Sequence, residues 1–330
     1  MPGSPSRGPG PRLAPVLAPP PPLRAGESVR LVAASSALGD PACLEQGVAL
    51  LEAWGLQVER PFDPARRWGY LAGDDRQRRA DLEGEARLLA CVRGGWGSAR
   101  LLEQDLPASD GWLLGFSDVT SLLWARLARG IGGGIHGPMV TGLAAEPDWS
   151  RERLRALLFG EPLPPLQGEP WRGGVAEGPL LVANLTVATH LLGTPFLPPL
   201  AGAVLVFEDV GEAPYRIERL LTHWRLCGAL QQLAGLGFGS FAGCEDPADT
   251  DTDTESDADT DTDIGETSEP PEHRFSLEEV LRERSADLGI PVVGRLPVGH
   301  APGNAALPLG SRARLDGATG QLSLLNWYGF

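Results

Sequence analysis

The sequence predicts an α/β protein whose first half contains a parallel sheet and whose second half forms a separate domain. With 330 residues and 42% hydrophobic residues, the chain is long enough for two domains that each bury a core. In the first half, short apolar runs alternate with stretches of helical periodicity, a pattern typical of parallel strands joined by helices. The proline- and glycine-rich segment 162–174 is the expected linker.

The first domain, residues 26–161, is predicted to begin with a strand and to alternate from there. Strands are expected at Ser28–Ala34, Gln57–Glu59, Leu88–Val92, Trp112–Leu114 and within Gly132–Met139. Helices are expected at Pro41–Gly55, Asp74–Glu85, Ser98–Leu106, Val119–Leu127 and Arg151–Phe159. Pro41 and Gly55 are typical of the first and last positions of a helix, which makes the first of these helices well defined.

The second domain, residues 175–330, is predicted to be richer in strands. Strands are expected at Leu180–Val182, Ala203–Phe207, Leu236–Ala242 and Ile290–Leu296, and helices at Tyr215–Leu230 and Phe275–Leu288. At the end of the chain, Ala306–Leu309 and Arg312–Leu315 are expected to pair with Gln321–Leu325 as antiparallel strands. The apolar residues Trp327–Phe330 should pack against the body.

Two segments are predicted to be disordered. Residues 1–25 are rich in proline and lack the continuous apolar core of a secretory signal. Residues 246–272 form an acidic insert of Asp alternating with Thr, Ser or Ala, without the spacing of a calcium-binding loop. The stretch 245–272 holds 13 of the 43 acidic residues and no arginine, so the rest of the chain is close to neutral.

Composition excludes several classes of function. The near-neutral body has no basic patch for a nucleic acid, and no apolar run is long enough to cross a bilayer. The chain has no lysine, which excludes a Walker lysine, a lysine Schiff base and a Ser–Lys dyad. The cysteines Cys43, Cys91, Cys227 and Cys244 lack metal-binding or disulfide spacing. The turn Arg93–Gly97 lacks the spacing of a dinucleotide fingerprint.

The segment Gly111–Gly130 organises the prediction of function. Its apolar strand turns at Gly115–Phe116 into a helix, and Ser117 occupies the junction. Ligands bind at this edge of an open α/β sheet, and the start of a helix favours negative charge. Ser117 is therefore a candidate nucleophile. The alternative is that Ser117 only caps the helix, since the segment lacks the second glycine of a nucleophile elbow.

A nucleophilic serine needs a base, a carboxylate that orients the base, and donors for the oxyanion. His300 lies on a glycine- and proline-rich loop, but the sequence does not choose between it and His136. Glu208 ends a buried strand, although it also suits a helix cap or a pair with Arg216. The amides of Gly94–Gly95 and Asp118 are candidate donors. The remaining histidines, which are weaker candidates for the base, are His190, His223 and His273.

Five motifs in the same order resemble the LD-carboxypeptidase family of serine peptidases, which includes murein tetrapeptide carboxypeptidases and microcin C immunity proteins. The motifs are RGGWGSAR at 93–100, GFSDVT at 115–120, HGPM at 136–139, EDVGEAPYRIER at 208–219 and GHAPGNAALPLG at 299–310. The resemblance implies an amino-terminal parallel-sheet domain of Rossmann or flavodoxin-like type and a smaller β-rich carboxyl-terminal domain. It also implies a triad of Ser117, Glu208 and His300, oxyanion donation by the amides of Gly95 and Asp118, no metal or cofactor, and a homodimer.

This resemblance implies a cytoplasmic hydrolase that releases a terminal D-amino acid from a small peptide, a murein tetrapeptide, through an acyl-enzyme. Trp96 replaces the tyrosine usual in the family, and Val182–Ala183 replaces a pair of glycines, which bears on specificity. One alternative is a hydrolase of aminoacyl-nucleotide antibiotics, in which Trp171 or Trp224 would stack on the base. Another is a peptide-binding protein without catalytic activity.

Overall fold

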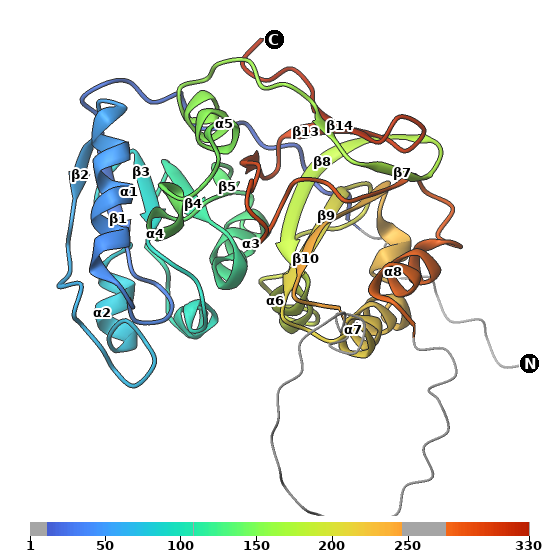
Figure 1. Cartoon of the computed structure of the whole chain (residues 1–330), viewed down its shortest axis with the longest axis horizontal. Helices are drawn as coiled ribbons and strands as arrows, with labels where there is room; N and C mark the ends of the chain where they lie inside the picture. The colour runs from blue at the N-terminus through green and yellow to red at the C-terminus, as the bar shows by residue number, and fades with distance from the viewer. Residues whose placement is uncertain (1–11, 108, 246–274, 330) are drawn as a thin grey trace, which may run out of the picture.

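The computed structural model describes residues 12–107, 109–245 and 275–329. These residues form two sheets that lie side by side, each with its own helices (Figure 1). The acidic insert 246–272 lies outside the described residues, as do residues 1–11 of the proline-rich extension. In the described part of the chain, no helix is both long enough and apolar enough to cross a membrane.

The first sheet has six strands in the order β12-β5-β4-β3-β1-β2. The strands are β1 (Ser28–Val32), β2 (Gln57–Glu59), β3 (Leu88–Cys91), β4 (Trp112–Gly115), β5 (Gly134–His136) and β12 (Leu307–Pro308). Strands β1 to β5 are parallel, and their order β2-β1-β3-β4-β5 is the flavodoxin-like order. The predicted parallel-sheet domain is confirmed. In this topology, ligands bind beyond the carboxyl ends of the strands, near the point where the strand order reverses.

Helices cover both faces of the first sheet, and their ends follow local sequence signals. They are α1 (Pro41–Ala53), α2 (Asp75–Ala80), η1 (Ser98–Glu103), η2 (Ser117–Val119), α3 (Thr120–Ala128), α4 (Val140–Leu143) and α5 (Asp148–Leu158). The side chain of Asp40 caps α1 by accepting from the amide of Ala42, and Asp74 forms a capping box with Gln77 at α2. Helix α1 buries Leu44, Val48 and Leu51, in agreement with the apolar spacing.

The second sheet has eight strands in the order β6-β14-β13-β8-β9-β10-β11-β7. They are β6 (Leu166–Gln167), β7 (Glu169–Arg172), β8 (Val175–Asn184), β9 (Val204–Val210), β10 (Gly235–Ala242), β11 (Val292–Gly294), β13 (Arg312–Asp316) and β14 (Gln321–Leu324). The associated helices are α6 (Leu185–His190), α7 (Pro214–Leu226), η3 (Leu230–Gln232) and α8 (Leu277–Ser285). The strand-rich character is confirmed, and the four central strands, β8 to β11, are parallel.

The segment 162–174, predicted as a linker, supplies both edges of the second sheet. Strand β6 pairs with β14 and strand β7 pairs with β11, at opposite ends of the strand order. Only Gly168 separates β6 from β7, so the sheet curls until its two edges meet at this residue. The amide of Gly168 donates to the carbonyl of Gly320. The linker prediction is therefore wrong for residues 166–172, where backbone pairing takes the place of a free connection.

The terminal strands also differ from the prediction. Strands β13 and β14 pair around a turn as expected. Strand β12 does not join them and pairs instead with β5 at the edge of the first sheet. The pairing partner of a two-residue strand is decided by which exposed edge lies within reach. Trp327 returns to the first core beside Trp112, as the apolar end of the chain predicted.

The proline-rich segment 12–25 is not disordered, contrary to the prediction. It runs across both halves of the molecule (Figure 1). The amides of Ala14, Leu17 and Leu23 donate to the carbonyls of Ala201, Gly310 and Leu158. Leu23 is 2% exposed. Proline disfavours helices and strands but permits an extended chain, and the apolar residues between the prolines bind this segment to the body.

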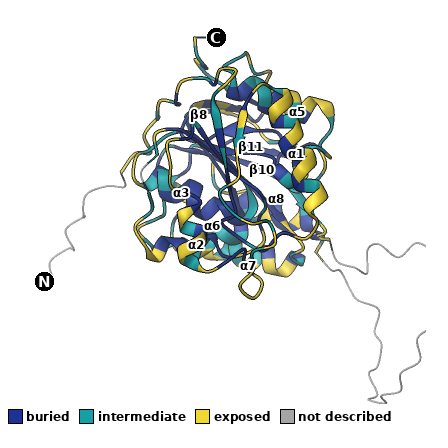
Figure 2. Ribbon diagram, turned by 90° about the vertical axis from the view of Figure 1, so that its left-hand side faces the viewer, coloured by how far each residue is buried: buried dark blue, intermediate teal, exposed yellow. Residues whose placement is uncertain are grey.

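The apolar core is continuous between the two halves. Trp124 on α3 packs edge to face against Trp224 on α7, with ring centroids 6.2 Å apart. The indole nitrogen of Trp124 donates to the carbonyl of Val182 on β8 at 3.0 Å. Figure 2 shows the buried strands in the interior and the exposed residues on the outer faces of helices such as α1 and α5. This interface fixes the carboxyl ends of the two sheets relative to each other.

The packing of the segment 12–25 leads to a prediction on stability. Replacing Leu23 by Ala removes a buried side chain, and we expect the free energy of unfolding to fall by about 2–3 kcal/mol. Replacing Leu13 by Ala should change the free energy of unfolding by less than about 0.5 kcal/mol, because Leu13 lies in the same segment but is 75% exposed. The measurement is the urea midpoint of both variants and the parent. Equal midpoints for all three proteins would contradict the packing.

Candidate active site

Ser117 lies in a strained turn at the carboxyl end of β4. Its backbone φ is 59°, in the left-handed region that residues other than glycine rarely adopt. A Cβ at Gly115 would lie 2.6 Å from a methyl group of Val119, so the turn into η2 closes only with glycine at that position. The cap position of η2 is Phe116 and that of α3 is Val119, so Ser117 occupies neither. The capping alternative is therefore wrong, and the turn presents the hydroxyl as a nucleophile elbow does.

Glu208 and His300 are joined by a short hydrogen bond. Glu208 lies on β9 and is fully buried, and its Oε2 is 2.6 Å from Nδ1 of His300. A carboxylate only accepts hydrogen bonds, so Nδ1 of His300 carries the proton and Nε2 is left as an acceptor. A Cβ at Gly299 would lie 2.8 Å from Oε2 of Glu208, which explains the glycine before the histidine. Arg216 pairs with Glu212 instead, so the proposed Glu208–Arg216 pair is wrong.

His136 is the second imidazole at this carboxylate. It ends β5 and is fully buried, and its Nε2 lies 3.7 Å from Oε1 of Glu208. The ring of Phe116 contacts the rings of both histidines. Of the two histidines, His300 lines the cavity of Ser117 and His136 does not, which favours His300 as the candidate base. The sequence offered one signal for a supporting role of His136, its position at the end of a strand beside the predicted site.

The surroundings of Glu208 favour its charged form. Burial alone would raise the pKa of Glu208, but contact with the imidazoles of His136 and His300 outweighs burial and places the pKa below its usual value. A carboxylate without water nearby needs such partners to remain charged. The ionised carboxylate can then orient His300 and stabilise an imidazolium that forms during proton transfer.

One predicted oxyanion donor, Asp118, follows Ser117 in the chain, and the other, Gly95, lines the same cavity as Ser117. Asp118 is held in place because its carboxylate accepts from the hydroxyl of Ser35 at 2.6 Å and from the amide of Ser98 at 2.8 Å. Burial raises the pKa of Asp118 above its usual value, although these hydrogen bonds act in the opposite direction. On the other side, a Cβ at Gly94 would lie 3.2 Å from Oγ of Ser117, so the glycine-rich turn lies against the nucleophile. Donation by the amides of Gly95 and Asp118 stays a prediction.

A cavity of about 550 Å³ brings these groups together between the two halves of the molecule. Ser117, Gly94, Gly95 and Arg93 line it from the first domain, and His300 lines it from the second. Its position at the carboxyl ends of the parallel strands is the one that the topology predicts for a ligand site. Among the described residues, no group of three or more His, Cys, Asp or Glu side chains could hold a metal ion.

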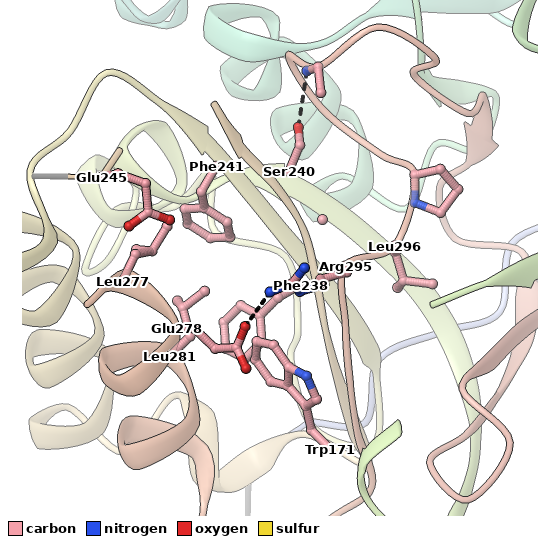
Figure 3. Close-up of a pocket in the computed structure, with 13 residues that line it drawn as sticks. Trp171, Phe238, Ser240, Phe241, Glu245, Leu277, Glu278, Leu281, Arg295 and Leu296 are labelled. Atoms are coloured by element: carbon pink, nitrogen blue, oxygen red, sulfur yellow. Dashed lines mark hydrogen bonds and ion pairs between the residues drawn. The ribbon is translucent and has the colours of Figure 1, made fainter. Parts of the chain in front are cut away.

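A second cavity, of about 410 Å³, is lined by Trp171, Phe238 and Arg295 (Figure 3), and also by Ala301, which follows His300 in the chain. Its walls are apolar in part and also carry Glu245, Glu278 and Arg295, and Ser240 accepts from the amide of Ala301 at its rim. Trp171 lines this second cavity and not the cavity of Ser117. Trp224 is fully buried in the core. Neither tryptophan is in a position to stack on a base beside Ser117, so both candidates for nucleotide stacking are wrong.

Comparison with known protein families matched both halves of the chain. Residues 29–137 match the model of the LD-carboxypeptidase N-terminal domain, and residues 177–315 match that of the LD-carboxypeptidase C-terminal domain. A protein of Synechocystis sp. assigned as a carboxypeptidase is 45% identical over 312 residues, 92% of this chain and 96% of its own. The murein tetrapeptide carboxypeptidase of Pseudomonas aeruginosa is 33% identical over 316 residues, 88% of this chain and 93% of its own.

Solved structures share the fold. The muramoyltetrapeptide carboxypeptidase of Oxalobacter formigenes superposes with a TM-score of 0.72 at 24% identity, over 89% of this chain and 97% of its own. A microcin C7 self immunity protein superposes with a TM-score of 0.78 at 18% identity, over 95% of this chain and 100% of its own. Both similarities concern the two-domain architecture.

The buried carboxylate predicts that stability depends on pH. A carboxyl group whose pKa is depressed by folding stabilises the fold above its unfolded pKa and loses this contribution as the pH falls through its folded pKa. Glu208→Gln should therefore lower the free energy of unfolding at neutral pH. The difference from the parent should shrink once the pH falls below about 4.3.

Urea unfolding of the parent and of Glu208→Gln over a series of pH values measures this difference. In a His136→Phe protein the contribution should be smaller and its loss should be complete at higher pH, because removing one of the two imidazoles raises the folded pKa of Glu208 towards its unfolded value. A difference between parent and Glu208→Gln that is constant across the acid range would show that Glu208 is not ionised in the fold.

Proposed function

The chain belongs to the LD-carboxypeptidase family of serine peptidases, and we propose that it hydrolyses the amide between an L-configured centre and the terminal D-alanine of a murein tetrapeptide. As a member of this family it is a carboxypeptidase and hence an enzyme, which sets aside the alternative of a binding protein without catalysis. The name of the relative from Pseudomonas aeruginosa supports the choice of substrate.

One observation carries the assignment of catalytic roles. Ser117 in a strained turn and His300 on a buried carboxylate line the same cavity, although 183 positions separate them in the sequence. Nδ1 of His300 donates its proton to Glu208, which leaves Nε2 as the base. This arrangement supports nucleophilic catalysis with the serine as nucleophile, the histidine as general base and the glutamate as the group that orients it.

The reaction proceeds in two halves. Nε2 of His300 accepts the proton of the Ser117 hydroxyl while Oγ bonds to the carbonyl carbon, and the amides of Asp118 and Gly95 stabilise the oxyanion. The carbon–nitrogen bond then breaks, and His300 returns the proton to the leaving amine of D-alanine. Water enters, His300 takes one of its protons, and the hydroxide attacks the acyl-enzyme. Oγ leaves with the proton from His300, which restores the enzyme and releases the shortened peptide.

A second candidate is the hydrolysis of an aminoacyl-nucleotide antibiotic by the same triad. It is favoured by the structural similarity to microcin C7 self immunity protein, which was solved with aspartyl sulfamoyl adenosine. That similarity is at 18% identity and concerns the fold. The positions of Trp171 and Trp224 away from the cavity of Ser117 favour the peptide substrate for this chain.

The nucleophile is tested by Ser117→Ala. We expect its kcat for release of D-alanine from murein tetrapeptide to fall by at least about 1,000-fold, because no acyl-enzyme can form. Ser121→Ala is the matched control, since Ser121 lies in the adjoining helix and is buried away from the cavity. Mass spectrometry of the peptide products measures both. Undiminished release by Ser117→Ala would contradict the proposed mechanism.

The substrate is tested by comparing kcat/KM of the parent on murein tetrapeptide and on an aminoacyl-nucleotide amide. We expect the tetrapeptide to be the better substrate by about 100-fold or more, because the cavity lacks a tryptophan for the base. A higher value for the nucleotide would favour the second candidate. Both substrates should lose turnover in Ser117→Ala, since the same serine would act on each.

A further inference from the structure

A carboxypeptidase must recognise the free carboxylate at the end of its substrate, and we propose that Arg93 binds this group. The inference rests on the proposed function and adds the residue that restricts cleavage to the terminal bond. A cation near the nucleophile suits this recognition, because the carboxylate of the leaving amino acid is one carbon away from the scissile nitrogen. Arginine meets a carboxylate with two parallel hydrogen bonds, which also fixes the orientation of the ligand.

The position of Arg93 fits this role. It follows β3 at the carboxyl end of the first sheet and lines the cavity together with Ser117 and His300. The next residue, Gly94, lies against the hydroxyl of Ser117. The guanidinium of Arg93 therefore extends from a backbone that touches the nucleophile. A carboxylate bound by Arg93 would therefore occupy the cavity that Ser117 lines.

The charge of Arg93 is available to a ligand. Its Nη1 donates to the carbonyl of Ala37 at 2.8 Å, which anchors the side chain and leaves other N–H groups of the fork for an anion. Within the described part of the chain, no carboxylate forms an ion pair with it. Other arginines of the same domain are paired, as in Arg66 with Asp81 and Arg100 with Asp75. The chain has no lysine to take the role.

The remaining charged groups at the cavity are consistent with this assignment. Arg93 is the one arginine among the described residues that line it. Asp40 lines it as well, but its carboxylate accepts from the amide of Ala42 at the start of α1.

The experiment compares murein tetrapeptide with its analogue that ends in D-alaninamide, which has the same scissile bond but no terminal charge. For the parent, kcat/KM should be higher on the acid by about 30- to 100-fold, the range expected of a hydrogen-bonded charge pair. In Arg93→Gln, kcat/KM on the acid should fall by this factor, whereas kcat/KM on the amide should stay within about threefold of the parent value. Arg93→Lys should recover part of the preference, because it restores the charge but not the fork.

Arg67→Gln is the matched control. Arg67 also donates to a backbone carbonyl of the loop before α1, that of Leu38, but it does not line the cavity. This variant should keep the preference of the parent for the acid. An equal loss on acid and amide in Arg93→Gln would show that Arg93 only supports the loop, and would overturn the proposal.

A binding measurement separates this proposal from the proposed function. In a Ser117→Ala background, calorimetry should show tighter binding of the acid than of the amide, and Arg93→Gln should abolish the difference. If the Ser117→Ala protein binds acid and amide with equal affinity while Arg93 is still present, the proposed role of Arg93 is overturned, whatever the turnover of the parent. The parent protein could instead release no D-alanine while the acid still binds more tightly than the amide through Arg93. That result would support the subsite and contradict the proposed reaction.

Discussion

The active site depends on the contact between helix α3 and the second sheet. Trp124 is buried against Trp224, and its indole nitrogen donates to the carbonyl of Val182. One turn earlier on the helix, the hydroxyl of Thr120 accepts from the amide of Asn184 at 3.2 Å. Asn184 is the residue on β8 that pairs in register with Glu208 on β9. The element that carries the nucleophile is thus fastened to the strand beside the carboxylate.

The second constraint is electrostatic. A fully buried glutamate is stable as an anion only if its neighbours replace water. Here His300 forms a hydrogen bond with one oxygen at 2.6 Å, and the ring of His136 lies 3.7 Å from the other without forming a hydrogen bond. The same arrangement fixes the tautomer of His300. Because the partner on the other oxygen is His136 from the first sheet, the charge of Glu208 also joins the two halves of the molecule. Catalytic geometry and domain association therefore rest on the same groups.

The ends of the chain reinforce this association. Residues 12–25 bond to Ala201, Gly310 and Leu158, which lie in both halves. Strand β12 follows the loop of His300 and pairs with β5, next to His136. A rigid link between the domains suits a site whose members come from both, since a small displacement of either domain would move Ser117 and His300 apart.

Much of this protein follows from its sequence. Short apolar runs with helical stretches between them predicted the parallel sheet, because burial on both faces of a strand leaves a continuous apolar signal. The five motifs predicted the family, and the turn at Ser117 was visible as an abrupt change from strand to helix.

Tertiary structure alone decided the rest. Local pattern does not say which sheet edge a two-residue strand such as β12 will find, or that proline-rich residues 12–25 have a surface to lie on. It also could not choose His300 over His136, or place Trp171 and Trp224 away from the site. Each of these outcomes depends on contacts between residues far apart in the chain, and the periodicity of side chains within one element carries no information about its distant neighbours.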